Sequence, residues 1–218
     1  MEAQIKRTVK AGNSSAVILP RSWLNKEVRV ELTKKTHEKI LLEVIEILKD
    51  HIESWEIIGI YLVGSYARGE ENEDSDIDIL VITNNIDQEM IKEGMYNMLI
   101  ISEELLKQKL NGDLLPIGQM IKEANPLLNA GYLNSIEIKI TKKNIKWYLE
   151  TTKKKLEIIR KVLEKIGQTY VRDEVLYTLV LRIRTLYIIR KIIEKRDYSK
   201  KDFIKIINYF SRGNNAYD

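Results

Sequence analysis

Apolar residues follow two different periods along this chain. Short apolar runs at 57–63 and 96–102, and a run at 76–83 whose apolar and polar positions alternate, predict three strands of one sheet. Helical spacing over 33–55, and after Ser102, predicts helices beside that sheet. From residue 145 onward only the helical period remains, which predicts helices over 145–166 and 174–195 and a shorter one capped by Ser199.

Two further segments complete the predicted fold. The first 32 residues contain strand-like runs at 5–10, 16–19 and 27–32, separated by Gly12 and Pro20, and are too short to bury a core alone. Isoleucines at 136, 138 and 140 predict one more strand within 129–140. We therefore expect an α+β protein: a β-hairpin segment at 1–32, a small mixed β-sheet with flanking helices at 33–144, and a helical bundle at 145–218.

Candidate chemistry is concentrated in the run GSYARGEENEDSDIDIL, residues 64–80. Gly64 ends the first apolar strand and permits a sharp turn, after which Ser65 is predicted to cap a helix whose N–H groups would suit a phosphate. Asp76 and Asp78 lie two residues apart on a strand, so both side chains should point to one face while Ile77 and Ile79 face the other. Two adjacent carboxylates predict a divalent cation, most simply Mg²⁺.

The order of strand, Gly64-Ser65, ten residues and Asp76-x-Asp78 resembles the signature of the DNA polymerase β-like nucleotidyltransferase superfamily. It is most similar to the minimal-nucleotidyltransferase branch that includes antitoxin-type protein adenylyltransferases. The resemblance implies ATP as substrate, two Mg²⁺ ions held by the catalytic Asp76 and Asp78, phosphate binding by Gly64 and Ser65, and AMP transfer to a hydroxyl of a toxin-like partner protein. Arg68 is a candidate nucleotide contact, although pairing with Glu70 or Asp74 is the favoured interpretation.

One position departs from that family. A third carboxylate usually lies on the next strand, where this chain has Asn97, and an amide lacks both charge and basicity. Glu103, Glu104 and Glu137 are the candidates to replace it. The competing hypothesis is a catalytically impaired, DNA-binding regulator or antitoxin that acts by binding. Adenylylation of a small molecule is a third and weaker possibility.

Composition narrows these alternatives. With 44% hydrophobic and 31% charged residues the chain can bury a sizeable core, and no apolar run is long enough to span a bilayer, so we expect a cytoplasmic protein without a membrane partner. It has no cysteine, which excludes disulfides and thiolate chemistry. His37 and His51 are its two histidines, both predicted on one helix, so neither a histidine metal cluster nor a histidine-dependent ribonuclease is expected.

Charge is uneven: residues 1–32 carry about +3, residues 33–144 about −8 and residues 145–218 about +9. The first segment is similar to AbrB-type swapped-hairpin domains, which implies a homodimer and DNA binding, with dimerisation alone as the alternative. The candidate DNA contacts are basic: Lys6, Arg7, Lys10, Arg21 and Arg29. In the last segment, Arg182, Arg184 and Arg190 could face a nucleotide, a polyanionic partner or solvent, and solvent is the favoured interpretation.

Overall fold

The protein is described here from a computed structural model that covers residues 6, 8–30, 35–72, 74–166 and 173–211. It separates into two compact units, Met1–Lys35 and Thr36–Asp218. This division falls three residues after the boundary at 32 and 33 that we predicted from the sequence. The nucleotidyltransferase-like segment and the C-terminal helices belong to one unit.

The first unit contains a small antiparallel hairpin, β1 (Thr8–Ala11) and β2 (Ser14–Val17), followed by the 3-10 turn η1 (Arg21–Trp23). Residues 27–30 are not in a strand, so that part of the predicted 27–32 strand is wrong, and 31–32 lie outside the described residues. The two hairpin strands pair with each other, and every residue of β1 is exposed. A third strand would therefore find no buried face of β1 to pack against. Large apolar side chains of this unit remain exposed, among them Ile18, Leu24 and Val30.

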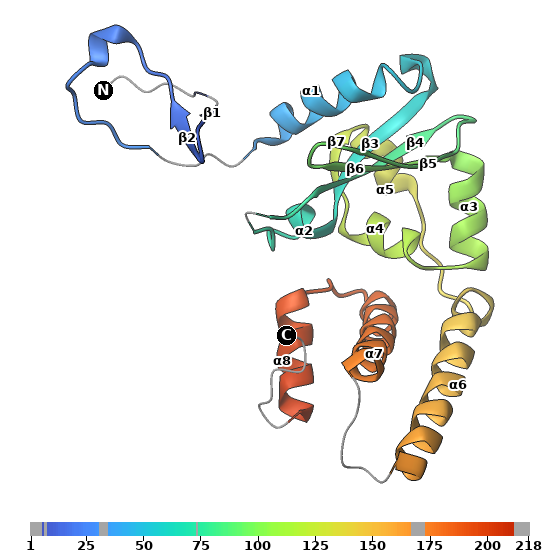
Figure 1. Cartoon of the computed structure of the whole chain (residues 1–218). Helices are drawn as coiled ribbons and strands as arrows, with labels where there is room; N and C mark the ends of the chain where they lie inside the picture. Colours follow the sequence, from blue (N-terminus) through green and yellow to red (C-terminus); the bar gives the residue numbers. More distant parts are fainter. Residues whose placement is uncertain (1–5, 7, 31–34, 73, 167–172, 212–218) are drawn as a thin grey trace. The chain divides into compact units, whose positions relative to one another are not determined.

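The second unit is built on a five-stranded mixed sheet of order β5-β6-β4-β3-β7 (Figure 1). Its central strands are β3 (Ile57–Val63), β4 (Ile77–Thr83) and β6 (Tyr96–Ser102), close to the three strands predicted. β4 and β6 run parallel, whereas β3 is antiparallel to β4. The edges are β5 (Gln88–Glu93) and β7 (Asn125–Leu128), both antiparallel to their neighbours. These features confirm the predicted α+β class.

Helices cover both faces of the sheet (Figure 1). α1 (His37–Leu48), which begins after the cap Thr36, packs Ile40 and Val44 on one face, together with Ile77 and Ile79 of β4. The short turn η2 (Ser54–Glu56) leads from it into β3. The other face carries α3 (Glu103–Gly112), α4 (Ile117–Glu123) and α5 (Ala130–Ser135), packed against the alternate residues of β3 and β4. Asp78 has the parity of this second face, as the alternation predicted.

The strand predicted within 129–140 is wrong. Residues 130–135 form α5, and 136–141 have no regular structure, while the added edge strand is β7, which contains Pro126. Proline lacks a backbone N–H and is tolerated at a sheet edge, which fits its pairing opposite Tyr61. Ile136 and Ile138 still become partly buried, because they pack onto the second face without joining the sheet.

The C-terminal part is helical, as predicted: α6 (Lys142–Ile166), α7 (Asp173–Ile193) and α8 (Lys200–Phe210). The Ser199 side chain caps α8 by accepting the Asp202 N–H at 3.2 Å. Phe203 is fully buried and forms a small core with Tyr198 and Ile207, against which Tyr187 of α7 packs. No helix in the described ranges is both long and apolar enough to cross a bilayer.

Candidate active site

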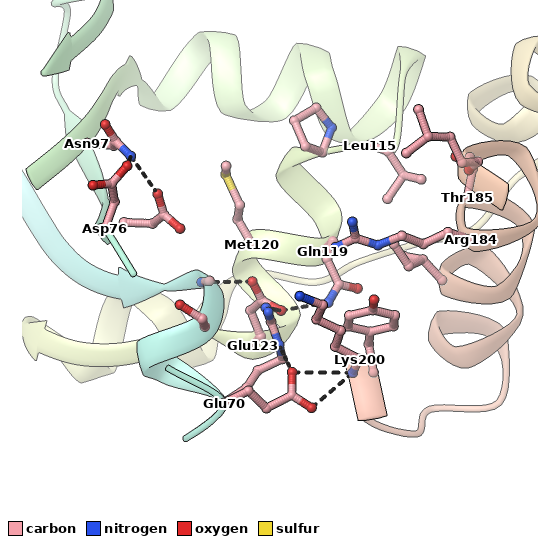
Figure 2. Close-up of a pocket in the computed structure, with 18 of the residues that line it drawn as sticks. Glu70, Asp76, Asn97, Leu115, Gln119, Met120, Glu123, Arg184, Thr185 and Lys200 are labelled. Carbon is pink, nitrogen blue, oxygen red and sulfur yellow. Dashed lines mark hydrogen bonds and ion pairs between the residues drawn. The ribbon is translucent and has the colours of Figure 1, made fainter. Parts of the chain in front are cut away.

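A cavity of about 1050 Å³ opens beside the start of β4 and is closed on its other side by the C-terminal helices (Figure 2). Its volume is at the upper end of the roughly 300–1,000 Å³ that is typical of small-molecule and cofactor sites. Gly64, Ser65, Asp76, Asp78 and Asn97 line it from the sheet side. The sequence motif and the cavity therefore coincide.

The two aspartates of the motif converge, as predicted. The Asn97 amide nitrogen donates to Asp76 Oδ2 at 3.1 Å and to Asp78 Oδ1 at 3.3 Å (Figure 2). The parallel pairing of β4 with β6 causes this arrangement, because it sets Asp78 directly beside Asn97 on the same face. Lys92 of β5 approaches Asp76 Oδ2 at 3.5 Å. The Asn97 amide thus contacts both carboxylates, and the Lys92 ammonium group contacts Asp76.

The ionised form of Asp78 is electrostatically unfavourable in this site. Burial raises the pKa of Asp78, and the neighbouring charge of Asp76 adds to the rise, although the Asn97 hydrogen bond and Arg68 oppose it. A carboxylate held in its charged form at this position would be stabilised by a cation. The pair suits a hard divalent cation, for which carboxylate oxygens are the preferred protein ligands.

The turn that precedes the aspartates differs in detail from the prediction. α2 (Gly64–Ala67) begins at Gly64 itself, its cap is Val63, and no side chain caps it, so Ser65 does not act as the N-cap. Gly64 has φ +71°, and a Cβ placed there would lie 2.2 Å from Asp78 Oδ2. Only glycine combines that backbone conformation with so close an approach. The glycine is therefore what lets Asp78 sit against the turn.

A glutamate that the sequence did not reveal occupies the centre of the site. Glu123, the last residue of α4, accepts the Gly64 N–H at 2.9 Å, the Arg68 Nη1–H at 2.7 Å and the Gln119 amide at 2.7 Å. The Gly64 N–H is thus already bonded to a carboxylate. Spacing along the chain gave no signal for Glu123, because 59 residues separate it from Gly64.

Arg68 is held between two acids. Its Nε lies 2.9 Å from Glu70 Oε2 and its Nη1 lies 2.7 Å from Glu123 Oε2. Burial by itself would lower the pKa of Arg68, but these two partners raise it. Pairing with Glu70 agrees with the favoured interpretation, whereas Asp74 takes no part in the recorded contacts of Arg68. Arg68 lines the cavity while its charge is already compensated.

Glu70 also joins the sheet side of the site to the last helix. Its carboxylate accepts the Ser199 hydroxyl at 3.0 Å. It also accepts the Lys200 backbone N–H at 2.9 Å (Figure 2). Burial opposes ionisation of Glu70, but the hydrogen bonds from Arg68 and Ser199 lower its pKa. Glu70 therefore has a structural role, since it connects Arg68 to the start of α8.

Other predicted residues do not reach the cavity. Glu103 bonds to Tyr132 and Lys107, Glu104 accepts from Gln108, and Glu137 pairs with Lys139. None of these three glutamates lines the cavity, and the described part of the chain contains no cluster of three or more His, Cys, Asp or Glu residues placed to hold a metal ion. The position at which the family usually has its third carboxylate therefore holds the Asn97 amide.

The candidate DNA contacts lie in the first unit. Lys6, Lys10, Arg21 and Arg29 are exposed there, and Arg7 lies outside the described residues. Their exposure is compatible with a nucleic-acid surface and equally with a solvated one. DNA binding stays a prediction.

A mixed sheet with a glycine turn, two converging carboxylates and a cofactor-sized cavity is the arrangement expected of an enzyme that acts on nucleotides. Comparison with known proteins specifies the enzyme class. The family model described as "Nucleotidyltransferase domain" matches residues 41–206, and the chain belongs to this family.

Similarity to individual curated proteins is more specific than the family match. MJ1305 of Methanocaldococcus jannaschii, named as a candidate protein adenylyltransferase, is 30% identical over 122 residues, which cover 55% of this chain and 78% of that protein. MJ0604 of the same organism, named likewise, is 37% identical over 84 residues, covering 34% of this chain and 82% of its own. MJ1379, with the same description, is 49% identical over 47 residues, 20% of this chain and 47% of its own.

Two solved structures are similar in part. One, titled "Crystal structure of the toxin-antitoxin with AMP-PNP", has 19% identity and a TM-score of 0.29, covering 56% of this chain and 98% of that one. A nucleotidyltransferase-like protein from Exiguobacterium sibiricum has 14% identity and a TM-score of 0.36, covering 67% and 58%. At these scores neither structure carries an argument about this chain.

Proposed function

We propose that this nucleotidyltransferase transfers AMP from ATP to a hydroxyl group of a partner protein. The observation that carries the proposal is the convergence of Asp76 and Asp78 on one amide, at the wall of a cavity that the Gly64 turn also lines. In the proposed reaction the acceptor oxygen bonds to the α-phosphorus of ATP, and the bond from that phosphorus to the bridging oxygen of pyrophosphate breaks. Pyrophosphate leaves and the hydroxyl proton passes to solvent.

Asp76 and Asp78 fit the divalent cation, Mg²⁺, that this reaction requires, with two ions expected. Their oxygens are hard ligands that accept from one shared amide, and the raised pKa of Asp78 reflects burial and negative charge that a cation would compensate. The amide oxygen of Asn97 is a neutral ligand available beside them. When bound, the metal would polarise the phosphate and stabilise the leaving pyrophosphate.

The remaining site residues position the nucleotide. Gly64 and Ser65 would lie against its phosphates, and Gly64 keeps Asp78 at the turn because no larger residue fits there. Arg68 is fixed by Glu70 and Glu123, so its proposed role is to hold the turn and both acids in place. Most of the rate enhancement would come from orientation and preorganised charge.

The acceptor is proposed from the relatives. Two of them are named as candidate protein adenylyltransferases and match this chain over about four-fifths of their own length. A hydroxyl-bearing residue of a toxin-like protein is the acceptor that we propose. The cavity is wide enough to admit a side chain beside a nucleotide.

The first experiment is incubation of the purified protein with α-labelled ATP, Mg²⁺ and candidate partner proteins. Label should appear on a partner, and γ-labelled ATP should leave none, because only the AMP part is transferred. Chelation of Mg²⁺ should stop the reaction. Transfer from γ-labelled ATP, or label on no protein under any condition, would contradict the proposal.

A second function is favoured by one specific observation, the neutral Asn97 where the family usually has a third acid. In that case the protein acts by binding, as a DNA-tethered regulator or antitoxin that occludes its partner. It would then retard DNA and bind a partner without labelling it. The assay above separates the two functions.

We also expect the first unit to make the protein a dimer. Its hairpin leaves apolar side chains exposed, with Ile18 67% and Leu24 72% accessible, and such a segment gains a core only by pairing with another copy. Removal of residues 1–35 should therefore give the mass of one shortened chain by light scattering, where the full-length protein gives the mass of two chains. The double variant Ile18→Lys, Leu24→Lys should weaken the dimer as well, whereas Lys10→Ala should not. An unchanged mass after the deletion would show that this expectation is wrong.

A further inference from the structure

α7 lines the side of the cavity opposite the sheet. From the sequence, the arginines of this helix could face a nucleotide, a polyanionic partner or solvent. Arg182 and Arg184 line the cavity, whereas Arg190 is exposed and pairs with Glu194 at 2.7 Å. From this placement we propose that Arg184 binds the terminal phosphates of the nucleotide, and so receives the departing pyrophosphate. The inference rests on the proposed function and adds a specificity residue from the C-terminal helices to it.

Arg182 and Arg184 both line the cavity without an ion pair to a described residue, but Arg182 donates from Nη1 to the Thr151 hydroxyl at 3.1 Å. Arg68 has two carboxylates within 2.9 Å and Arg190 has one, but Arg184 has no ion pair with any described residue. Its Nε is buried and makes no hydrogen bond within the described part of the chain. A buried guanidinium N–H without an acceptor is unfavourable, and a phosphate oxygen would supply the acceptor.

Arg184 lies beside Tyr198, at the end of the cavity where Arg68 also contacts that ring. The guanidinium carbon of Arg184 lies 5.5 Å from the centre of that ring, and the guanidinium carbon of Arg68 lies 5.4 Å from it. Two cations thus share one aromatic ring. Glu70 and Glu123 already neutralise Arg68, so of the two cations at this ring Arg184 is the one without an ion pair to a described residue.

The contacts run in order from the acidic end of the cavity to the basic end. Asp78 lies against Gly64, the Gly64 N–H donates to Glu123, and Glu123 holds Arg68. Tyr198 then separates Arg68 from Arg184. Figure 2 shows the same order, with Asp76 and Asn97 at one end, Glu123 between, and Arg184 toward the C-terminal helices.

This polarity matches a metal–triphosphate. The cation and the reacting α-phosphate would lie at the aspartates, and the anionic tail would extend past the turn toward Arg184. An arginine suits that tail because its planar fork donates two parallel hydrogen bonds to phosphate oxygens. A mononucleotide bound at the aspartates would not reach Arg184, so the arginine would distinguish ATP from AMP.

The test compares Arg184→Gln with Arg190→Gln, a matched control that removes the same charge from the same helix outside the cavity. Calorimetry on the full-length protein would measure binding of ATP with Mg²⁺, of AMP with Mg²⁺, and of inorganic tripolyphosphate. Arg184→Gln should weaken ATP and tripolyphosphate binding about ten- to hundredfold, the loss expected for charge-assisted hydrogen bonds, and leave AMP binding unchanged. Arg190→Gln should bind all three as the unmodified protein does.

Arg184→Lys keeps the positive charge and the aliphatic part of the side chain but lacks the planar guanidinium. It should therefore bind ATP more tightly than Arg184→Gln and less tightly than the unmodified protein. This variant also provides a test if Arg184→Gln folds poorly. Equal loss of ATP and AMP binding would overturn the inference, as would an Arg184→Gln variant indistinguishable from the control. In both of those results the unmodified protein still binds ATP, and the proposed function stands. Failure of the unmodified protein to bind ATP would overturn both.

Discussion

Replacing Asp78 with asparagine is expected to reduce AMP transfer by roughly 10²–10³-fold, the scale of loss when one group that stabilises transition-state charge is removed. The double change Asp76→Asn, Asp78→Asn should abolish transfer, because no carboxylate then remains beside Asn97 to hold the cation. Transfer of label from α-labelled ATP measures both effects.

Asp78→Asn by itself should not lower the stability of the fold. The pKa of Asp78 is raised by burial and by Asp76, so above that pKa its ionised form makes an unfavourable contribution to folding, which asparagine removes. We expect an equal or higher melting temperature for Asp78→Asn at neutral pH. Asp74→Asn, in the exposed part of the same loop, is the control and should keep full activity. Full activity in Asp78→Asn would exclude this carboxylate from the reaction.

Gly64→Ala is the second change with a large expected effect. The added Cβ would lie 2.2 Å from Asp78 Oδ2, so the carboxylate or the turn must move. A displacement of about 1 Å from the productive geometry can cost on the order of 10²-fold in rate, and we expect a loss of at least that size. Steady-state rates with saturating ATP would measure it.

The matched control for Gly64→Ala is Gly69→Ala. Gly69 has a similar positive φ of +63°, but nothing lies within 4 Å of the position that its Cβ would take. Both variants should lose about 1 kcal/mol or more of unfolding free energy from left-handed backbone strain, measured by urea denaturation. Only Gly64→Ala should lose activity. Equal activity in the two variants would mean that the close approach to Asp78 is irrelevant.

Much of the fold followed from local patterns. The bounds of β3 and β6 agree with the predicted 57–63 and 96–102, because continuous apolar runs of that length fit strands buried on both faces. Ser102 and Ser199 cap α3 and α8 as predicted, since capping depends on residues within one turn. β5 was not predicted, because four of the six residues in its sequence QEMIKE are polar and it joins the sheet by pairing with β6.

In the candidate site, too, local features were predictable from the sequence and long-range contacts were not. The two aspartates were predictable because alternation along one strand decides which residues share a face. The error at Ser65 arose because the turn is shaped by Glu123, which binds Gly64 from another element and leaves no need for a side-chain cap. The placement of Arg184 in the cavity depends on how α7 packs beside the sheet, and its sequence is equally compatible with a solvated face.

By itself, the sequence determined the three central strands, the C-terminal helices, the face on which Asp76 and Asp78 lie, and the family signature, because each depends on residues close together in the chain. Tertiary structure alone decided that Glu123 occupies the Gly64 N–H, that Glu123 is a second partner of Arg68, and that Arg184 faces the cavity without a carboxylate partner among the described residues. These contacts join residues 55 or more positions apart, or elements on opposite sides of the cavity, and local patterns do not encode such separations.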